Sequence, residues 1–261
     1  MLQVTRAIGA GSTVEDLMTS IEMTLGRRRM MAHPGPRTRR LRRALLACGI
    51  LSWLLYLATD ILGGLRYDGY SFTSQAISEL MAIGAPSESF VDPLFLIYGV
   101  LALGFGVGVF REGAGRSRAL RIAGALLIVY ALIGFTGPTL FEMHPRGAGG
   151  EANDVPHILV TALLVALLLS VLGVAAFALG KQFRNYTFAT LVVVIAFGGL
   201  SGMYGARLAA GQPTPGFGIV ERTHVYAFLI WIAVFAAVLL RRSPLMIADP
   251  QPAPSAATVE I

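Results

Sequence analysis

The sequence has little charge and almost no cysteine. Only 14% of its 261 residues are charged, whereas 55% are hydrophobic, a balance outside the range of ordinary soluble domains. The single cysteine, Cys48, lies inside an apolar run, so an intrachain disulfide is impossible and cysteine usage does not indicate a redox compartment. The composition therefore excludes a typical soluble domain and indicates a polytopic membrane protein.

The first 43 residues lack the apolar core of a secretory signal peptide. They contain three acidic residues and a late cluster of arginines, which is not the pattern of a cleaved leader. We expect residues 1–43 to be a basic, disordered cytoplasmic extension. The Pro- and Ala-rich residues 243–261 are expected to be a disordered cytoplasmic tail.

Six apolar runs are long enough to cross a hydrocarbon core of about 30 Å. They cover residues 44–65, 93–110, 119–141, 156–179, 187–206 and 223–240. The predicted fold is therefore all-α: a transmembrane domain over residues 44–242, with a bundle of six transmembrane helices and a short extracytoplasmic amphipathic helix.

The basic residues predict how the helices are oriented. Placing the amino terminus in the cytoplasm leaves 17 of the 21 basic residues in cytoplasmic segments, as the positive-inside rule requires. Only Arg66, Arg146, Arg207 and Arg222 then lie outside. We therefore expect a multi-pass protein of the plasma membrane with both termini in the cytoplasm.

The long connection at residues 66–92 predicts the short amphipathic helix. In SFTSQAISELMAIG, helical spacing puts five small or apolar residues on one face, after Ser and Thr residues that can cap a helix. These five residues are Ala76, Ile77, Leu80, Met81 and Gly84. The helix would bring Ser78 and Glu79 to the outer mouth of the bundle.

Compact catalytic signatures such as HExxH are absent, but three of the four histidines fall at outer ends of spans. The stretch EMHPRGAGGEANDVPH, residues 142–157, carries two of them with three carboxylates. We predict an outer polar cluster assembled from several connections. Its members are Ser78, Glu79, His144, Arg146, Asp154, His157, Glu221, Arg222 and His224.

This cluster has two interpretations that the residues leave open. Imidazoles suit zinc or a similar divalent metal, which makes His144, His157 and His224 candidate ligands. Asp154, Glu79 and Glu221 would then be candidate catalytic carboxylates, and Ser78, Arg146 and Arg222 would contact the ligand. In the other interpretation these residues cap helix ends and pair with each other: Asp154 suits an N-cap, and Arg222 needs a carboxylate partner.

Three further functions fit less well. Gly-Leu-Ser-Gly at 199–202 is similar to the serine motif of rhomboid proteases, with His224 as a conceivable base, but glycines spaced by four residues, such as Gly198 and Gly202, more often mark helix packing. A permease should have polar features near mid-membrane, whereas the span centres here are apolar. Nucleic-acid binding is not needed to explain the basic arm, because attraction to anionic lipid accounts for it.

Three stretches resemble a known family. YSFTSQAISELMAIGAPS, MHPRG followed by DVPH, and GIVERTHVYAFLIWIAV together resemble the bacterial membrane-protein family catalogued as domain of unknown function 998, particularly its actinobacterial branch. The resemblance covers residues 44–242 and implies a multi-span membrane protein with no assigned reaction. It implies family patterns at residues 78–80, 143–147, 154–157 and 218–222, but it does not extend to His224.

Two functional hypotheses follow. The first is an extracytoplasmic polar site that binds a membrane lipid headgroup or a metal and, if catalytic, performs metal-assisted lipid hydrolysis. The second is a non-enzymatic structural or partner subunit whose polar residues hold the outer connections together.

Overall fold

The structure is a computed structural model that describes residues 18–19, 35–146 and 154–242. Residues 243–261 and most of residues 1–43, the two segments expected to be disordered, lie outside these residues, as does Glu151. The prediction is wrong for residues 36–43, which are described and form the start of a helix that continues to Leu65. The chain divides into two units between residues 41 and 42, and the architecture below concerns residues 42–242.

The described residues form helices and no strands. The elements are α2 (Pro36–Leu65), the 3₁₀ turn η1 (Ser78–Met81), α3 (Glu88–Gly113), α4 (Arg118–Leu140), α5 (Val155–Ala175), α6 (Lys181–Met203), α7 (Gly205–Ala209) and α8 (Phe217–Arg241). Six of them are long and apolar enough to cross a membrane. The predicted all-α, six-helix class is confirmed.

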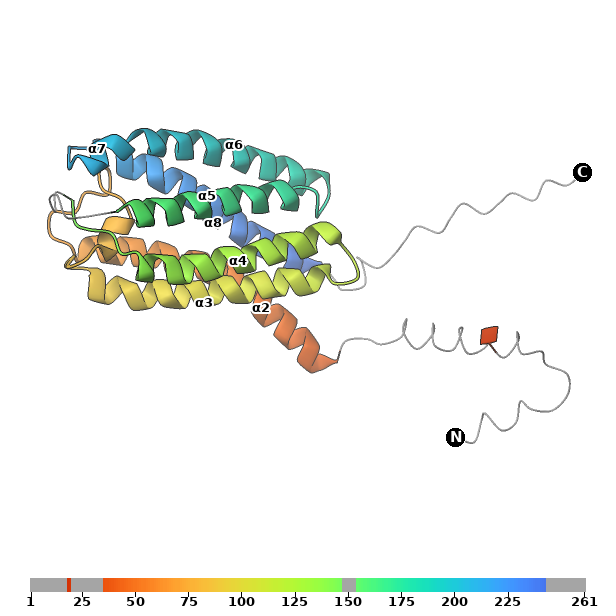
Figure 1. Cartoon of the computed structure of the whole chain (residues 1–261). Coiled ribbons are helices and arrows are strands. Elements are labelled where there is room, and N and C mark those ends of the chain that lie inside the picture. The colour runs from red at the N-terminus through yellow and green to blue at the C-terminus, as the bar shows by residue number, and fades with distance from the viewer. Residues whose placement is uncertain (1–17, 20–34, 147–153, 243–261) are drawn as a thin grey trace, which may run out of the picture. The chain divides into compact units, whose positions relative to one another are not determined.

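Successive helices run up and down beside one another (Figure 1). Helix α3 packs on α4, α4 on α5, α5 on α6, and α6 on α8. Helix α2 comes close to α3 and α8 at Gly49, where an added Cβ would lie 2.7 Å from the Phe105 ring and 2.9 Å from the Ala236 Cβ. The glycine thus permits a close approach that any larger side chain would prevent.

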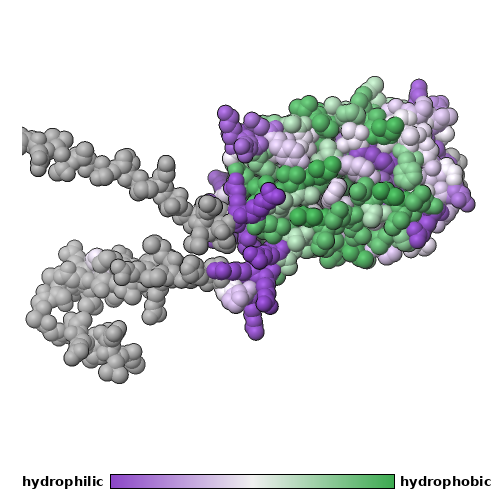
Figure 2. All heavy atoms as spheres, turned by 180° about the vertical axis from the view of Figure 1, so that it is seen from behind, coloured by the Kyte–Doolittle hydropathy of each residue, from purple (hydrophilic) through white to green (hydrophobic). Residues whose placement is uncertain are grey.

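The bundle has two chemically different ends. We call the end formed by residues 66–87, 141–146 and 204–216 the cap end, and the opposite end, formed by residues 111–118, 176–184 and 239–242, the basic end. Figure 2 shows apolar surface along the sides of the helices and hydrophilic residues mainly towards the ends. Such an apolar flank is what the hydrocarbon of a bilayer requires.

The core is centred on α8. Trp231, Phe235 and Phe228 are fully or almost fully buried and pack against Phe105 and other aliphatic and aromatic side chains of the neighbouring helices. The indole Nε1 of Trp231 donates to Thr187 Oγ1 at 2.9 Å, so the one polar atom of this large ring is satisfied within apolar surroundings. This core fixes α8, and with it the polar residues in the first turns of α8.

Two sequence predictions change in detail. Helix α8 begins at Phe217 rather than 223, because its charged residues Glu221 and Arg222 find partners inside the protein and the helix continues through them. The amphipathic helix is reduced to η1, although the predicted apolar residues Ala76, Ile77 and Leu80 are buried. Gly84 instead occupies an exposed turn with φ of +75°.

Candidate functional site

A buried arginine lies at the centre of the cap end. Arg222, in the second turn of α8, forms a bidentate ion pair with Asp60 of α2: Nε to Oδ2 at 2.9 Å and Nη2 to Oδ1 at 2.8 Å. Asp60 is 1% exposed and Arg222 is 9% exposed. Parallel bonds of this kind are among the strongest between side chains.

The other donors of Arg222 are also used. Nη1 donates to the carbonyl oxygens of Phe72 at 2.9 Å, Gln75 at 3.0 Å and Gly218 at 3.2 Å. Nη2 also donates to Tyr70 Oη at 2.5 Å, and Tyr226 Oη donates to Asp60 Oδ2. A guanidinium has five N–H donors, so every donor has an acceptor here. We call Asp60, Tyr70, Arg222 and Tyr226 the Arg222 cluster.

Gly218 allows residues 72–75 to lie against α8. A Cβ on this residue would lie 2.6 Å from the Gln75 carbonyl oxygen and 2.9 Å from Arg222 Nη1, and it would also meet the Phe72 carbonyl oxygen. Any side chain larger than hydrogen would therefore push residues 72–75 away from the guanidinium. The glycine is a condition for the cluster to form.

A second arginine cluster covers the first. Arg146 pairs with Glu79, Nη2 to Oε1 at 2.6 Å and Nε to Oε2 at 3.2 Å, and donates through Nη1 to Thr214 Oγ1 at 2.7 Å. Glu79 is 3% exposed and also accepts the backbone N–H of Ala76 at 2.8 Å. We call Glu79, Arg146 and Thr214 the Arg146 cluster.

The two clusters join segments that are distant in sequence. Arg146 also donates to the carbonyl oxygens of Ser74 at 3.4 Å and Gln212 at 3.3 Å, and Thr214 donates to Ser74 at 2.8 Å. Three connections, α2–α3, α4–α5 and α7–α8, are therefore tied into one cap. The N–H donors of both arginines therefore bond to acceptors of the same chain.

His144 is a polar side chain of the cap that is both hydrogen-bonded and partly exposed. Its Nδ1 lies 2.8 Å from Asp154 Oδ1, and its backbone N–H donates to the same oxygen at 3.0 Å. The two side chains are 34% and 32% exposed. A carboxylate only accepts, so Nδ1–H donates to it, and in the neutral imidazole Nε2 is the remaining acceptor. Asp154 takes the predicted N-cap position of α5 without a side-chain capping bond.

The other two histidines are placed differently. His157 Nδ1 lies 2.9 Å from the carbonyl oxygen of Phe141, and His224 is buried, with an Nδ1 that makes no hydrogen bond of good geometry. Among the described residues, no three His, Cys, Asp or Glu side chains meet as a metal-ligand set. The predicted metal site stays a prediction without a third ligand in this part of the chain.

The remaining candidates contact the α2–α3 connection. Glu221 Oε2 accepts the backbone N–H of Ile77 at 2.7 Å. Ser78 Oγ lies 3.3 Å from Met143 Sδ, next to the backbone bond from Ile83 N to Met143 O at 2.9 Å. Both residues therefore hold η1 against the bundle.

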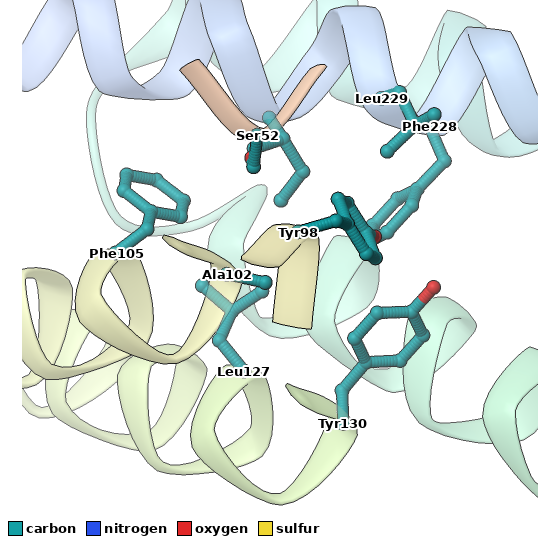
Figure 3. A pocket seen from close by; sticks show the side chains of 9 residues that line it. Ser52, Tyr98, Ala102, Phe105, Leu127, Tyr130, Phe228 and Leu229 are labelled. Atoms are coloured by element: carbon teal, nitrogen blue, oxygen red, sulfur yellow. The ribbon is translucent and has the colours of Figure 1, made fainter. Parts of the chain in front are cut away.

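Within the described part of the chain, one cavity inside the helix bundle is too small for a substrate. The cavity in Figure 3 measures about 10 Å³ and is lined mainly by apolar residues, with Ser52, Tyr98 and Tyr130 contributing hydroxyls. That volume accommodates about one water molecule. Within the described residues no hydrogen bond joins Ser201 to His224, and both side chains leave a buried atom unbonded, so the protease alternative gains no support.

Sequence reasoning missed Asp60, Tyr70 and Tyr226. A carboxylate inside an apolar span is itself a signal, since intramembrane charges are expensive and usually paired. Asp60 satisfies that criterion, because it lies inside the apolar run at residues 44–65. The two tyrosines carry no pattern that distinguishes them from ordinary interfacial aromatic residues.

Comparison with known proteins identifies a family but no characterised relative. No curated protein and no solved structure matches the chain. The model of the DUF998 family, described as a protein of unknown function, matches residues 35–238. That span contains all six long helices except the last three residues of α8, and both arginine clusters. The chain therefore belongs to the DUF998 family of multi-pass membrane proteins.

Proposed function

We propose that the cap end binds the polar headgroup of a membrane lipid through His144. The observation that carries the proposal is the double attachment of His144 to Asp154 Oδ1, by the ring and by the backbone. This attachment fixes the tautomer of the neutral ring and restrains its direction, so Nε2 is the remaining acceptor of a side chain that is 34% exposed. Binding through it requires a ligand that donates a hydrogen bond.

The electrostatics of the cap favour such a donor over an anionic ligand. Arg146 and Arg222 are committed to Glu79 and Asp60, and Arg66 stacks on the Phe90 ring with 3.7 Å from its Cζ to the ring centroid. Binding a phosphate through either buried arginine would break bonds that the protein already makes. A primary ammonium or hydroxyl headgroup can use His144 without that cost.

The surroundings of His144 suit a lipid. Leu140 is 72% exposed, Leu159 63% and Ile158 54%, all near the ends of α4 and α5 where the His144–Asp154 pair lies. Exposed apolar side chains at the ends of membrane spans contact acyl chains, as they do along the rest of the flank, so a ligand held at His144 would lie beside lipid. The distribution of basic residues favours a position outside the cytoplasm for this end, and we therefore propose a lipid of the outer leaflet as the ligand.

If the site is catalytic, the His144–Asp154 pair would act on the bound lipid. An imidazole oriented by a carboxylate can accept a proton from a headgroup hydroxyl or a water molecule. A metal-assisted version needs a third ligand beside His144 and His157. Metal content of the purified protein, wild type against His144→Ala and His157→Ala, distinguishes the two: a near-stoichiometric metal that both variants lose would favour the metal version.

The test of headgroup binding compares two lipids whose headgroups differ in whether the ammonium group can donate hydrogen bonds. Phosphatidylethanolamine and phosphatidylcholine of matched chains carry the same charge, but only the first has ammonium hydrogens. In native mass spectrometry of the full chain, we expect preferential retention of phosphatidylethanolamine, lost in His144→Ala and in Asp154→Asn. The matched control is Asp68→Asn, an exposed carboxylate at the same end. Equal retention of both lipids by the wild type would contradict the proposal.

A second candidate function is favoured by the saturated arginines. In the Arg222 and Arg146 clusters, the arginine donors all bond within the chain. This arrangement suits a non-enzymatic structural or partner subunit with a rigid cap. Such a protein would retain neither lipid selectively and would lose partner binding, rather than lipid, when the cap is loosened.

A further inference from the structure

A groove opens at the basic end, between the start of α6 and the end of α8. It has a volume of about 490 Å³, within the range of about 300–1,000 Å³ typical of small-molecule sites. Its lining combines side chains of two kinds, apolar ones along the helices and basic ones at the rim. The residues are Leu179, Gly180, Lys181, Gln182, Phe183, Tyr186, Val234, Val238 and Arg242.

The rim of the groove is positively charged and lacks acidic partners. Lys181 is exposed, and Arg242 is half-buried with Nη2 bonded to the carbonyl oxygen of Leu179. No Asp or Glu occurs in residues 155–220 or 223–242. The described acid at this end is Glu112, and Arg42 occupies both of its oxygens, at 2.5 and 3.2 Å. The rim charges are therefore uncompensated within the described chain.

The backbone of the rim is held in place. The carbonyl oxygen of Arg242 accepts from Arg42 Nη2 at 3.1 Å, so the end of α8 is tied to α2. Gly180, the N-cap of α6, has φ of +101° and no side chain. A ligand can thus approach the start of α6 closely without meeting a side-chain cap.

The apolar wall runs from the rim towards mid-membrane. Val234 and Val238 are half-buried on α8, one turn apart, and Phe183 and Tyr186 face them from α6. Both helices have the length and hydropathy of membrane spans, with Lys181 first in α6 and Arg242 just after α8. The basic rim therefore falls where lipid phosphates lie, and the wall falls where acyl chains lie.

We propose that this groove binds one anionic phospholipid, with its phosphate at Lys181 and Arg242 and an acyl chain along Val234 and Val238. Charge complementarity decides the occupant. A second copy of the chain would bring the same positive rim against itself, and a zwitterionic lipid would leave the net positive charge uncompensated. The site is at the opposite end from His144 and does not depend on headgroup binding there.

The experiment measures lipid retention by the full chain in native mass spectrometry, with phosphatidylglycerol against phosphatidylcholine of matched chains. We expect selective retention of one phosphatidylglycerol and a loss of about fivefold in its affinity for Lys181→Gln, the worth of one basic residue near a membrane surface. Lys181→Arg should restore it. Arg116→Gln, an exposed arginine of the α3–α4 connection at the same end, makes the same charge change away from the groove and should leave retention unaltered.

A second variant tests the apolar wall of the groove without changing any charge. Val238→Trp fills the wall and keeps every charge, and we expect it to lower phosphatidylglycerol retention while the variant unfolds at the same temperature in lipid-free detergent. His144→Ala should leave phosphatidylglycerol retention unchanged, which distinguishes this site from the one at the cap end.

Four results would overturn the proposal. They are equal losses for Lys181→Gln and Arg116→Gln, no effect of Val238→Trp, displacement of the bound lipid by inorganic phosphate alone, and a change in oligomeric mass instead of lipid content. The first indicates diffuse attraction, the second a site elsewhere, the third a simple anion site, and the fourth a protein interface.

Discussion

The two ends of the bundle use basic side chains in opposite ways. At the cap end, Arg222 and Arg146 are buried or partly buried and give their donors to carboxylates, hydroxyls and carbonyl oxygens of the same chain. At the basic end, Arg42 pairs with Glu112, and Lys181 is exposed. Similar residues thus serve as internal cross-links at one end and as uncompensated charge at the other.

The difference shows how a position within the fold decides what an arginine can do. A guanidinium with every donor satisfied rigidifies the segments it joins and has nothing left for a ligand. An exposed ammonium at the end of an apolar groove stabilises the fold little, because exposed charges contribute about 0–1 kcal/mol, but it is available to a partner. If the cap-end arginines are internal cross-links, removing them should destabilise the protein according to the bonds that are lost.

Removing the guanidinium of the Arg222 cluster should have the largest effect. In Arg222→Ala, Asp60 stays buried with only Tyr226 as a side-chain partner, and breaking a buried pair costs about 3–5 kcal/mol. Arg222→Lys should recover only part of the loss, because an ammonium cannot reproduce the bidentate geometry. The free energy of unfolding, measured by titration with a denaturing detergent, checks this. A full recovery by lysine would contradict the geometry.

Arg146→Ala should lower the free energy of unfolding less than Arg222→Ala does, and its effect should be more local. Glu79 keeps its bonds to Ala76 N and Gln75 Nε2, so we expect a loss of about 2–3 kcal/mol. Because Arg146 joins three connections, hydrogen exchange should speed up in residues 66–87 before the helices are affected. Arg207→Ala, an exposed arginine of the same end, is the control, with an expected change of about 0.5 kcal/mol or less.

Gly218→Ala tests the approach of residues 72–75 to α8 without touching a charge. The added methyl would overlap two carbonyl oxygens that Arg222 binds, and overpacking of this kind costs about 1–3 kcal/mol. Gly198→Ala makes the same change where no atom lies within 4 Å, and alanine is the better helix former by about 1 kcal/mol. Equal stabilities of the two variants would mean that residues 72–75 yield freely.

Tyr70→Phe should have the smallest effect at neutral pH, about 1 kcal/mol for one hydrogen bond, and a distinct effect in alkali. Burial raises the pKa of Tyr70 above its ordinary value, so its contribution is fully present below pH about 10, the pKa of an unfolded tyrosine. It is lost as the pH rises from there towards the folded pKa. The wild type should therefore lose more stability above pH about 10 than Tyr70→Phe; parallel curves would contradict this.

The sequence was sufficient for the fold class because length and hydropathy alone decide which segments can span a membrane. The sequence was less informative where polar residues lie inside helices. Helix α8 extends through Glu221 and Arg222 because partners within residues 60–77 form hydrogen bonds with both side chains. Those partners are distant in sequence, so the pattern around α8 does not predict them.

Of the five residues that the helical period around Ser78 put on one face, Ala76, Ile77 and Leu80 are buried, Met81 is half-buried and Gly84 is exposed. The period did not predict the length of η1. Glu79 accepts from Ala76 N and Gln75 Nε2, as at a helix start, but the backbone becomes extended at Ala82 and the turn ends at Met81.

The sequence indicated which residues share one end of the bundle better than it indicated which of them contact each other. Glu79, Arg146, Arg222, His144 and Asp154 are at the cap end as expected, but they form separate clusters: Arg222 with Asp60, Arg146 with Glu79, and His144 with Asp154. Residue types and topology indicate which end of a helix a side chain occupies. They do not indicate which of several carboxylates at that end it meets, because that depends on the path of the connections.

A double-mutant cycle on Asp60 and Arg222 tests most directly the claim that the cap-end arginines are internal cross-links. We predict that Asp60→Ala and Arg222→Ala each lower the free energy of unfolding by about 3–5 kcal/mol, and that the double variant is no worse than the poorer single one, a large coupling energy. Additive losses, or single variants as stable as the wild type, would contradict the claim and return Arg222 to the residues available for a ligand.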